Sequence, residues 1–117
     1  MKLVIIESPY AGDIEANTIY ARKCLMDSLR RGEAPLASHL LYPQVLIEDI
    51  PEERQWGIDA GLAWRSVCDY AIFYVDKGWS NGMKVALKTY VSEYKAVKVR
   101  RLDMPDVDDI ARHEHLF

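Results

Sequence analysis

Two short apolar runs constrain the fold of this chain more than any other feature. Residues 2–7 and 69–75 are rich in β-branched and aromatic side chains. They lack the alternation of apolar and polar residues that is typical of a strand with one solvent-exposed face. Uninterrupted apolar strands are typical of parallel sheets whose two faces are both covered by helices. We therefore expect residues 2–7 to form a central strand and residues 69–75 to form a second buried strand of an α/β fold.

The segments between these runs carry helix signals. Asp13 is a typical N-cap for a helix that Gly32 ends, and Pro51 suits the first turn of a second helix. The stretch from Ser80 to Tyr94 is amphipathic, which predicts a third helix with one buried face. Strand and helix signals therefore alternate along the chain.

The spacing of apolar and small residues predicts which face is buried in two of these helices. In the first helix, apolar or small residues recur at Ile14, Thr18, Ala21, Leu25 and Leu29. In the second helix, the stripe Trp56, Ala60, Ala63 and Val67 has helical spacing and small central residues. We expect both faces to lie on the sheet.

A weak strand at Pro35–Ser38 and an edge strand of alternating apolar and basic residues at Val97–Leu102 complete the order. This order predicts a flavodoxin-like (Rossmann-like) three-layer sandwich, with a mostly parallel sheet of about four to five strands. The domain would span residues 1–102 and be followed by a C-terminal tail, 103–117. The dinucleotide motif G-x-G-x-x-G is absent, so NAD and FAD are not implied and we expect no cofactor.

Composition narrows the classes of function. The chain has 117 residues and a net charge of -3, which gives no electrostatic support to general nucleic-acid binding. No apolar run approaches membrane-spanning length, and the amino terminus lacks signal-peptide features. Cys24 and Cys68 sit in apolar periodic segments, which favours two buried thiols over a disulfide. We expect a cytoplasmic protein that contacts no membrane.

The loop Asp76–Gly82 joins a buried strand to a helix, and ligands of open α/β sheets bind at such strand ends. The loops at this edge of the sheet offer aromatic, hydroxyl, amide and carboxylate groups that suit a nucleoside-sized ligand. Their candidate residues are Ser8, Pro9, Tyr10, Gly12, His39, Asp76, Trp79, Ser80, Asn81 and Gly82. The alternative is that Asp76 and Ser80 only form a turn and cap the helix.

Other candidate residues have structural alternatives. His39 is a candidate acid, base or phosphate contact, or a satisfied structural histidine. The pair His113 and His115 invites a metal interpretation, but residues two apart do not share a helix face, so we expect no metal site. Trp56 and Trp64 are expected to pack internally or at an interface.

Several motifs in order resemble one known group. They are Ile6–Gly12 with Asn17 following, Ala37–Tyr42, Ile50–Arg54 and Tyr74–Met83. Together they resemble small phage and bacterial proteins of unknown function that are similar to nucleoside 2-deoxyribosyltransferases. The resemblance covers residues 2 to about 102 and adds Asn17 to the candidate ligand-binding residues.

The resemblance implies a flavodoxin-like fold and a superfamily whose active members cleave the N-glycosidic bond of deoxynucleosides or their monophosphates. Those enzymes use a glutamate in a pattern like Ser-x-Gly-x-x-x-Glu. Ser80 and Gly82 match this pattern, but Ala86 occupies the glutamate position. A methyl group cannot attack an anomeric carbon, so the usual covalent route is closed.

Three hypotheses follow from this departure. The first is a nucleotide- or nucleoside-binding protein, phage-encoded and sequestering a nucleotide-derived defence signal. The second is an N-glycoside hydrolase or deoxyribosyltransferase that uses another carboxylate, with Glu7, Asp59 and Asp76 as the catalytic candidates. The third is a protein-interaction module. The resemblance also implies a homo-oligomer, a dimer or larger, with aromatic helix faces at the interface.

Overall fold

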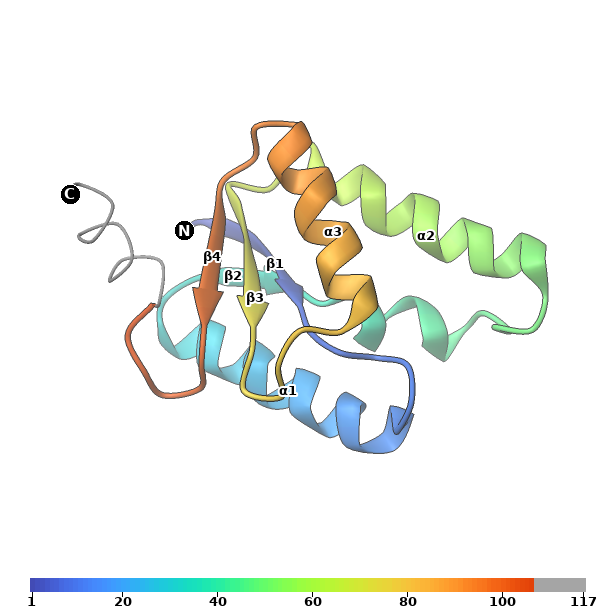
Figure 1. Ribbon diagram of the computed structural model, residues 1–117, viewed down its shortest axis with the longest axis horizontal. Helices are drawn as coiled ribbons and strands as arrows, with labels where there is room; N and C mark the ends of the chain where they lie inside the picture. The colour runs from blue at the N-terminus through green and yellow to red at the C-terminus, as the bar shows by residue number, and fades with distance from the viewer. Residues whose placement is uncertain (107–117) are drawn as a thin grey trace.

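The computed structural model describes residues 1–106, which form a four-stranded, all-parallel sheet with helices packed around it (Figure 1). The elements in chain order are β1 (Leu3–Glu7), α1 (Ile14–Arg30), β2 (Ala34–Leu36), the 3₁₀ turns η1 (Ser38–Leu40) and η2 (Tyr42–Gln44), α2 (Pro51–Arg65), β3 (Tyr70–Tyr74), α3 (Asn81–Ser92) and β4 (Val97–Arg100). The predicted α/β class and the flavodoxin-like arrangement are confirmed.

The strand order is β2-β1-β3-β4, so β1 is central and β4 lies at an edge, both as predicted. Residue Val4 pairs with Pro35 on one side and with Tyr70 on the other. The chain moves outward from β1 to β2 and then returns past β1 to β3. This reversal makes the gap between the carboxyl ends of β1 and β3 the topological switch point, where ligands of open α/β sheets bind.

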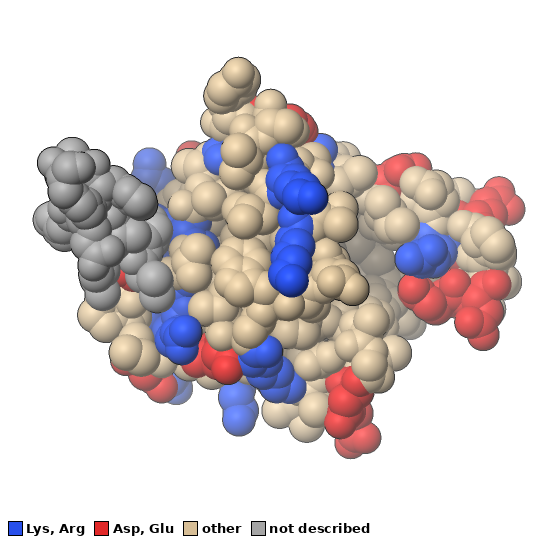
Figure 2. All heavy atoms as spheres, viewed as in Figure 1, with Lys and Arg blue, Asp and Glu red and all other residues tan. Residues whose placement is uncertain are grey.

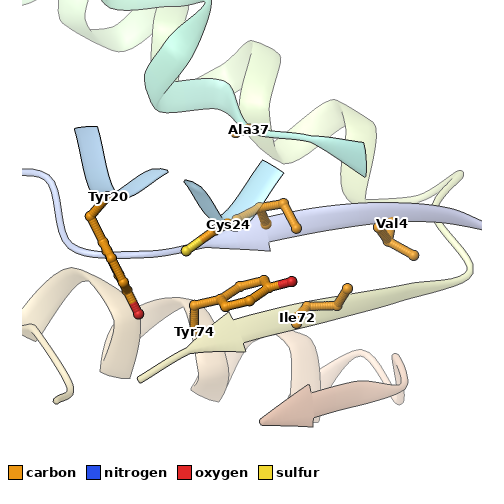
Figure 3. Packing of buried hydrophobic residues seen from close by; sticks show 7 residues of the cluster. Val4, Tyr20, Cys24, Ala37, Ile72 and Tyr74 are labelled. Carbon is orange, nitrogen blue, oxygen red and sulfur yellow. The ribbon is translucent and has the colours of Figure 1, made fainter. Parts of the chain in front are cut away.

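Helices α1 and α3 cover opposite faces of the sheet. Tyr20 and Cys24 of α1 point toward Ile72 and Tyr74 of β3, next to Val4 (Figure 3). On the other face, Met83 and Tyr90 of α3 pack against Ala71, Phe73 and Val75. Both cysteines are buried and free, as predicted, and burial raises the pKa of the Cys24 thiol to about 12.

The buried face of α1 matches the predicted one in the middle of the helix, where Ala21 is buried and Leu25 packs on the core, and differs at its ends. Ile14 and Leu29 are each 48% exposed, and the helix instead buries its polar residues Asp27 and Ser28. These polar groups turn inward because they have partners there: Ser28 Oγ donates to Glu33 Oε1 at 2.7 Å, and Tyr74 Oη donates to Asp27 Oδ2 at 2.7 Å. The prediction treated apolarity as the only reason for burial.

A buried ionic network covers the face of β4 that lies on the α1 side of the sheet, where Arg100 contacts Tyr74. The side chain of Arg100 is 1% exposed and binds Glu33 and Asp106. Arg31 binds Asp27 and reaches Asp106, and Lys98 also binds Asp106. The network closes the sheet edge on this side.

The position of α2 contradicts the prediction for its stripe. None of the helix residues 51–65 is buried, and Trp56 is 54% exposed and Val67 56% exposed. The helix packs instead on the loop before it: a Cβ at Gly57 would lie 3.1 Å from a methyl of Leu46, so a larger residue there would require this methyl to shift. The stripe Trp56, Ala60, Ala63 and Val67 therefore does not lie on the sheet.

No helix within residues 1–106 is long and apolar enough to cross a membrane.

Candidate functional site

Two loops meet at the switch point between β1 and β3. The first follows β1 and turns through Gly12, whose φ of +96° favours glycine. The second follows β3 and turns through Gly78, at φ +83°. Asn17 joins them: its side-chain amide donates to Tyr10 O at 3.0 Å, and its oxygen accepts from Lys77 Nζ at 3.1 Å. The predicted meeting of these two loops is present in the structure.

The loop after β2 reaches the same edge through His39. The rings of Tyr10 and His39 lie 4.7 Å apart, tilted by 36°. Burial lowers the pKa of His39, and only the nearby Glu48 opposes this. The lowered pKa of His39 favours its neutral form, a polar aromatic ring, over the cation.

Asp76 is held by groups from two other elements. Its Oδ2 accepts a hydrogen bond from Tyr20 Oη at 2.6 Å, and its carboxylate accepts from the Leu102 backbone N–H at 3.2 Å. The Asp76 N–H donates to the same Tyr20 hydroxyl at 3.0 Å. The carboxylate thereby ties the ends of β3 and β4 to α1, while the residue stays exposed.

The beginning of α3 combines a capping role with aromatic packing. Ser80 is the N-cap, and its Oγ accepts from the Met83 N–H at 3.2 Å. Trp79 stacks on Phe73 with ring centroids 5.2 Å apart. Asn81 and Gly82 are exposed in the first helical turn. The structural alternative thus accounts for the side chain of Ser80, and Asn81 and Gly82 remain open to solvent.

A second polar cluster lies on the α3 face of the sheet, where Tyr90 packs on Phe73. Glu7 ends β1, and its Oε2 accepts from Tyr90 Oη at 2.8 Å. Among residues 1–106, its Oε1 has no hydrogen-bond partner. Burial raises the pKa of Glu7, although the bond from Tyr90 and the charge of Arg65 both oppose the rise. A carboxyl group with a raised pKa and a free oxygen is suited to proton transfer or to ligand binding.

The remaining candidates lie elsewhere or play packing roles. Ser8 and Pro9 are buried at the start of the loop that follows β1. Asp59 lies on the exposed side of α2, where Gln55 donates to it at 2.8 Å, and takes no part in either cluster. Ala86 packs against the cluster around Phe73 and Tyr90.

Within residues 1–106 no group of three or more histidine, cysteine, aspartate or glutamate side chains is arranged to hold a metal ion. His113 and His115 lie outside the described residues.

Four residues at the site were not singled out from the sequence. Lys77 follows Asp76 directly, so its position in the loop was the available signal. Tyr20, Arg65 and Tyr90 lie on three different helices, and no local pattern distinguishes them from packing residues. Their roles depend on partners 56 residues away for Tyr20 and 83 residues away for Tyr90.

A family model of a domain of unknown function, DUF7768, matches residues 2–100. The chain belongs to the DUF7768 family. The matched residues include all four strands and the side chains of both polar clusters, so the site lies within the DUF7768 domain. No curated protein matches the chain. The resemblance to deoxyribosyltransferases stays a prediction.

Proposed function

We propose that this DUF7768 domain binds a nucleoside or nucleotide at the carboxyl edge of its sheet. The observation that carries the proposal is the joining of two loops across the switch point by Asn17 and Lys77, with their side chains 3.1 Å apart. Crevices at such points are where open α/β sheets hold ligands. The side chains around the switch point of this sheet match parts of a nucleotide.

The base and the phosphate of the ligand each have a matching group. The tilted pair Tyr10 and His39 offers an aromatic surface for a base, and Lys77 is a point charge suited to a phosphate. Lys77 is exposed, and its ammonium lies 5.3 Å from the ring centroid of Tyr20. A binding protein without the usual glutamate nucleophile would retain its ligand intact and so sequester it.

The test is calorimetric titration of the whole chain with nucleosides, nucleotides and cyclic nucleotide signals. For a phosphate-bearing ligand, Lys77→Met should weaken binding roughly tenfold, about 1.4 kcal/mol. The control is Lys84→Met, which removes another exposed lysine, on α3, and should leave binding unchanged. No binding by any member of the panel would contradict the proposal.

A second candidate function, cleavage of an N-glycosidic bond, is favoured by Glu7. Its partly buried carboxyl group has a raised pKa, is oriented by Tyr90 and, among residues 1–106, has a free Oε1. In its protonated form Glu7 would give its proton to the departing base as the C–N bond breaks. Water would then bond to the anomeric carbon and lose a proton to solvent. Of the three candidate carboxylates, Glu7 alone combines these properties.

The test of this second function is the release of free base from the ligand, measured by chromatography. Glu7→Gln should abolish release, whereas Asp59→Asn should not change it, because Asp59 lies away from the edge. Turnover that survives Glu7→Gln would remove Glu7 as the acid. Binding without any base release would leave the first function and exclude the second.

A further inference from the structure

We propose that three cations, on β4 and at the end of α1, form a binding site for a phosphate group, and that Asp106 of this chain occupies the site as an internal ligand. These cations, the cation cluster, are Arg31, Lys98 and Arg100. Arg100 Nη2 and Lys98 Nζ lie 3.1 and 3.3 Å from Asp106 Oδ2. Arg31 Nη1 lies 3.6 Å from Asp106 Oδ1. The inference does not depend on the ligand proposed above.

Two members of the cation cluster are held in place by groups other than the internal ligand. Glu33 binds the guanidinium of Arg100 at two points, 2.8 and 3.0 Å away. Asp27 accepts from Arg31 Nε at 2.9 Å. Donors that are already fixed lose little freedom when an anion binds. The cation cluster would therefore keep its arrangement if the internal ligand moved away.

The charge of the cation cluster depends on a residue outside the family match. Of the described carboxylates that bind these cations, Asp27 and Glu33 lie inside the match, which covers residues 2–100. Asp106 lies beyond the match and supplies the third negative charge. Because Arg100 is buried, an uncompensated positive charge beside it would be unfavourable. An anion that replaced Asp106 would therefore be bound favourably.

The donors suit phosphate better than a carboxylate. Arg100 donates to Asp106 through two nitrogens, Nε and Nη2, a two-point geometry by which arginine also binds phosphate. The 3.6 Å between Arg31 Nη1 and Asp106 Oδ1 is too long for a hydrogen bond. The carboxylate thus leaves this donor of the third cation unused. A phosphate has additional oxygens, one of which could accept from Arg31.

Asp106 lies on a segment that can move without unfolding the sheet. Residues 101–106 follow β4, and four of these six residues are exposed. Outside the cation cluster, one contact that holds the segment is the Leu102 N–H, which donates to the exposed Asp76 at 3.2 Å. Segments with exposed hydrogen bonds and few buried apolar contacts open locally at a small cost in free energy. A competing anion could therefore displace Asp106.

Surface charge favours the approach of an anion to this part of the molecule. Most of the lysine and arginine side chains seen in Figure 2 lie over the half that carries β4 and α1, whereas acidic side chains gather at the end where α2 begins. Arg30 ends α1 and Arg101 follows β4, and both are exposed. A basic surface raises the local concentration of anions.

The first test is thermal unfolding of full-length Asp106→Asn in inorganic phosphate, compared with chloride at equal ionic strength. The melting temperature should rise by several degrees in phosphate, because the variant no longer supplies its own anion. The control is Asp103→Asn, an exposed carboxylate of the same segment, which should rise much less because Asp106 still competes. Adding Lys98→Met to Asp106→Asn should remove most of the phosphate effect.

Two outcomes of this test would overturn the proposal. One is a folded Asp106→Asn protein whose melting temperature is the same in phosphate and in chloride. The other is an equal rise in Asp106→Asn and in Asp103→Asn, because binding would then not require the place of Asp106.

A second measurement needs no variant and decides the matter if Asp106→Asn does not fold. In the wild type, phosphate should compete with Asp106 and release residues 101–106. Trypsin should then cut after the exposed Arg101 several-fold faster in phosphate than in chloride of equal ionic strength, as measured by mass spectrometry of the fragments. Cutting after Arg54, which is exposed on α2, is the internal control and should be equal in both salts. Equal rates after Arg101 in the two salts would then overturn the proposal.

Discussion

The guanidinium of Arg100 holds the carboxylate of Glu33 at two points, with Nη1 2.8 Å from Oε1 and Nη2 3.0 Å from Oε2. The two residues are 67 positions apart, and both are buried. Arg100 also binds Asp106, so one cation serves two buried carboxylates. The pairing joins the last strand to the turn that precedes β2.

Removing this cation should strongly destabilise the protein. Arg100→Met would leave Glu33 and Asp106 buried without their main partner, and we expect a loss of about 3–5 kcal/mol in the free energy of unfolding. Urea denaturation followed by circular dichroism measures it. Arg101→Met is the control, because the neighbouring Arg101 is exposed and its loss should change stability by less than about 0.5 kcal/mol.

Stability should fall in acid. Burial alone raises the pKa of Glu33, but hydrogen bonds from Arg100, Tyr70 and Ser28 outweigh burial and hold the pKa below its usual value. The pKa values of Asp27 and Asp106 are lowered in the same way. Groups whose pKa is lower in the folded state contribute stability that is present above the unfolded value and lost as pH falls through the folded value.

The melting temperature should therefore be highest near neutral pH and drop below about pH 4, the usual range of unfolded carboxyl groups. Scanning calorimetry from pH 7 to pH 3 measures this. In the Arg100→Met variant the drop should be smaller, since the carboxylates have lost their main cation. A melting temperature that stays constant down to pH 3 would contradict the prediction.

Glu7 should behave in the opposite sense. Burial raises its pKa, so its contribution to stability is present below the unfolded pKa and is lost as pH rises through the folded pKa. Glu7→Gln keeps an oxygen for the Tyr90 hydroxyl and removes the buried charge. We expect a higher melting temperature than wild type at pH 8 and a smaller difference at pH 4.

The control for Glu7 is Glu15→Gln, which changes an exposed glutamate of α1 and should give no gain at either pH. A loss of stability in Glu7→Gln at pH 8 would show that the charge is compensated. A gain there would fit a group retained for function at a cost in stability.

The Tyr20 hydroxyl should stabilise the loop after β3. It donates to Asp76 Oδ2 at 2.6 Å and accepts from the Asp76 N–H at 3.0 Å. Tyr20→Phe removes both bonds, and we expect a loss of about 1.5–3 kcal/mol, measured by urea denaturation. Tyr94→Phe, at a residue that is 97% exposed, should have almost no effect. Equal effects of the two changes would argue against the role given to Tyr20.

Local signals predicted the elements well. Asp13 and Ser80 cap α1 and α3 through their side chains, at 3.0 Å from the Ala16 N–H and 3.2 Å from the Met83 N–H. The central position of β1 followed from a run without alternation, because only a strand covered on both faces tolerates that pattern. These features depend on residues close in sequence, and so the sequence predicts them.

Features built by distant partners escaped prediction. From the sequence, Glu33 and Arg100 are indistinguishable from ordinary charged surface residues, because nothing near either one in the sequence reveals the other. At the site, the contact of Tyr10 with His39 could be expected, because the carboxyl ends of parallel strands share one edge of the sheet. The hydrogen bond between Glu7 and Tyr90 could not, because it depends on which side of α3 faces β1. The stripe of α2 was misassigned because spacing identifies an apolar face but not what covers it.

The strand order also bears on how the chain emerges from the ribosome. β1 is synthesised before β3, at Tyr70–Tyr74, yet β3 is one of its two neighbours in the sheet. At roughly 5–20 residues per second, β1 waits on the order of ten seconds or less for that neighbour. During this interval a strongly apolar strand has an open edge, which makes the nascent domain a candidate client for a ribosome-associated chaperone.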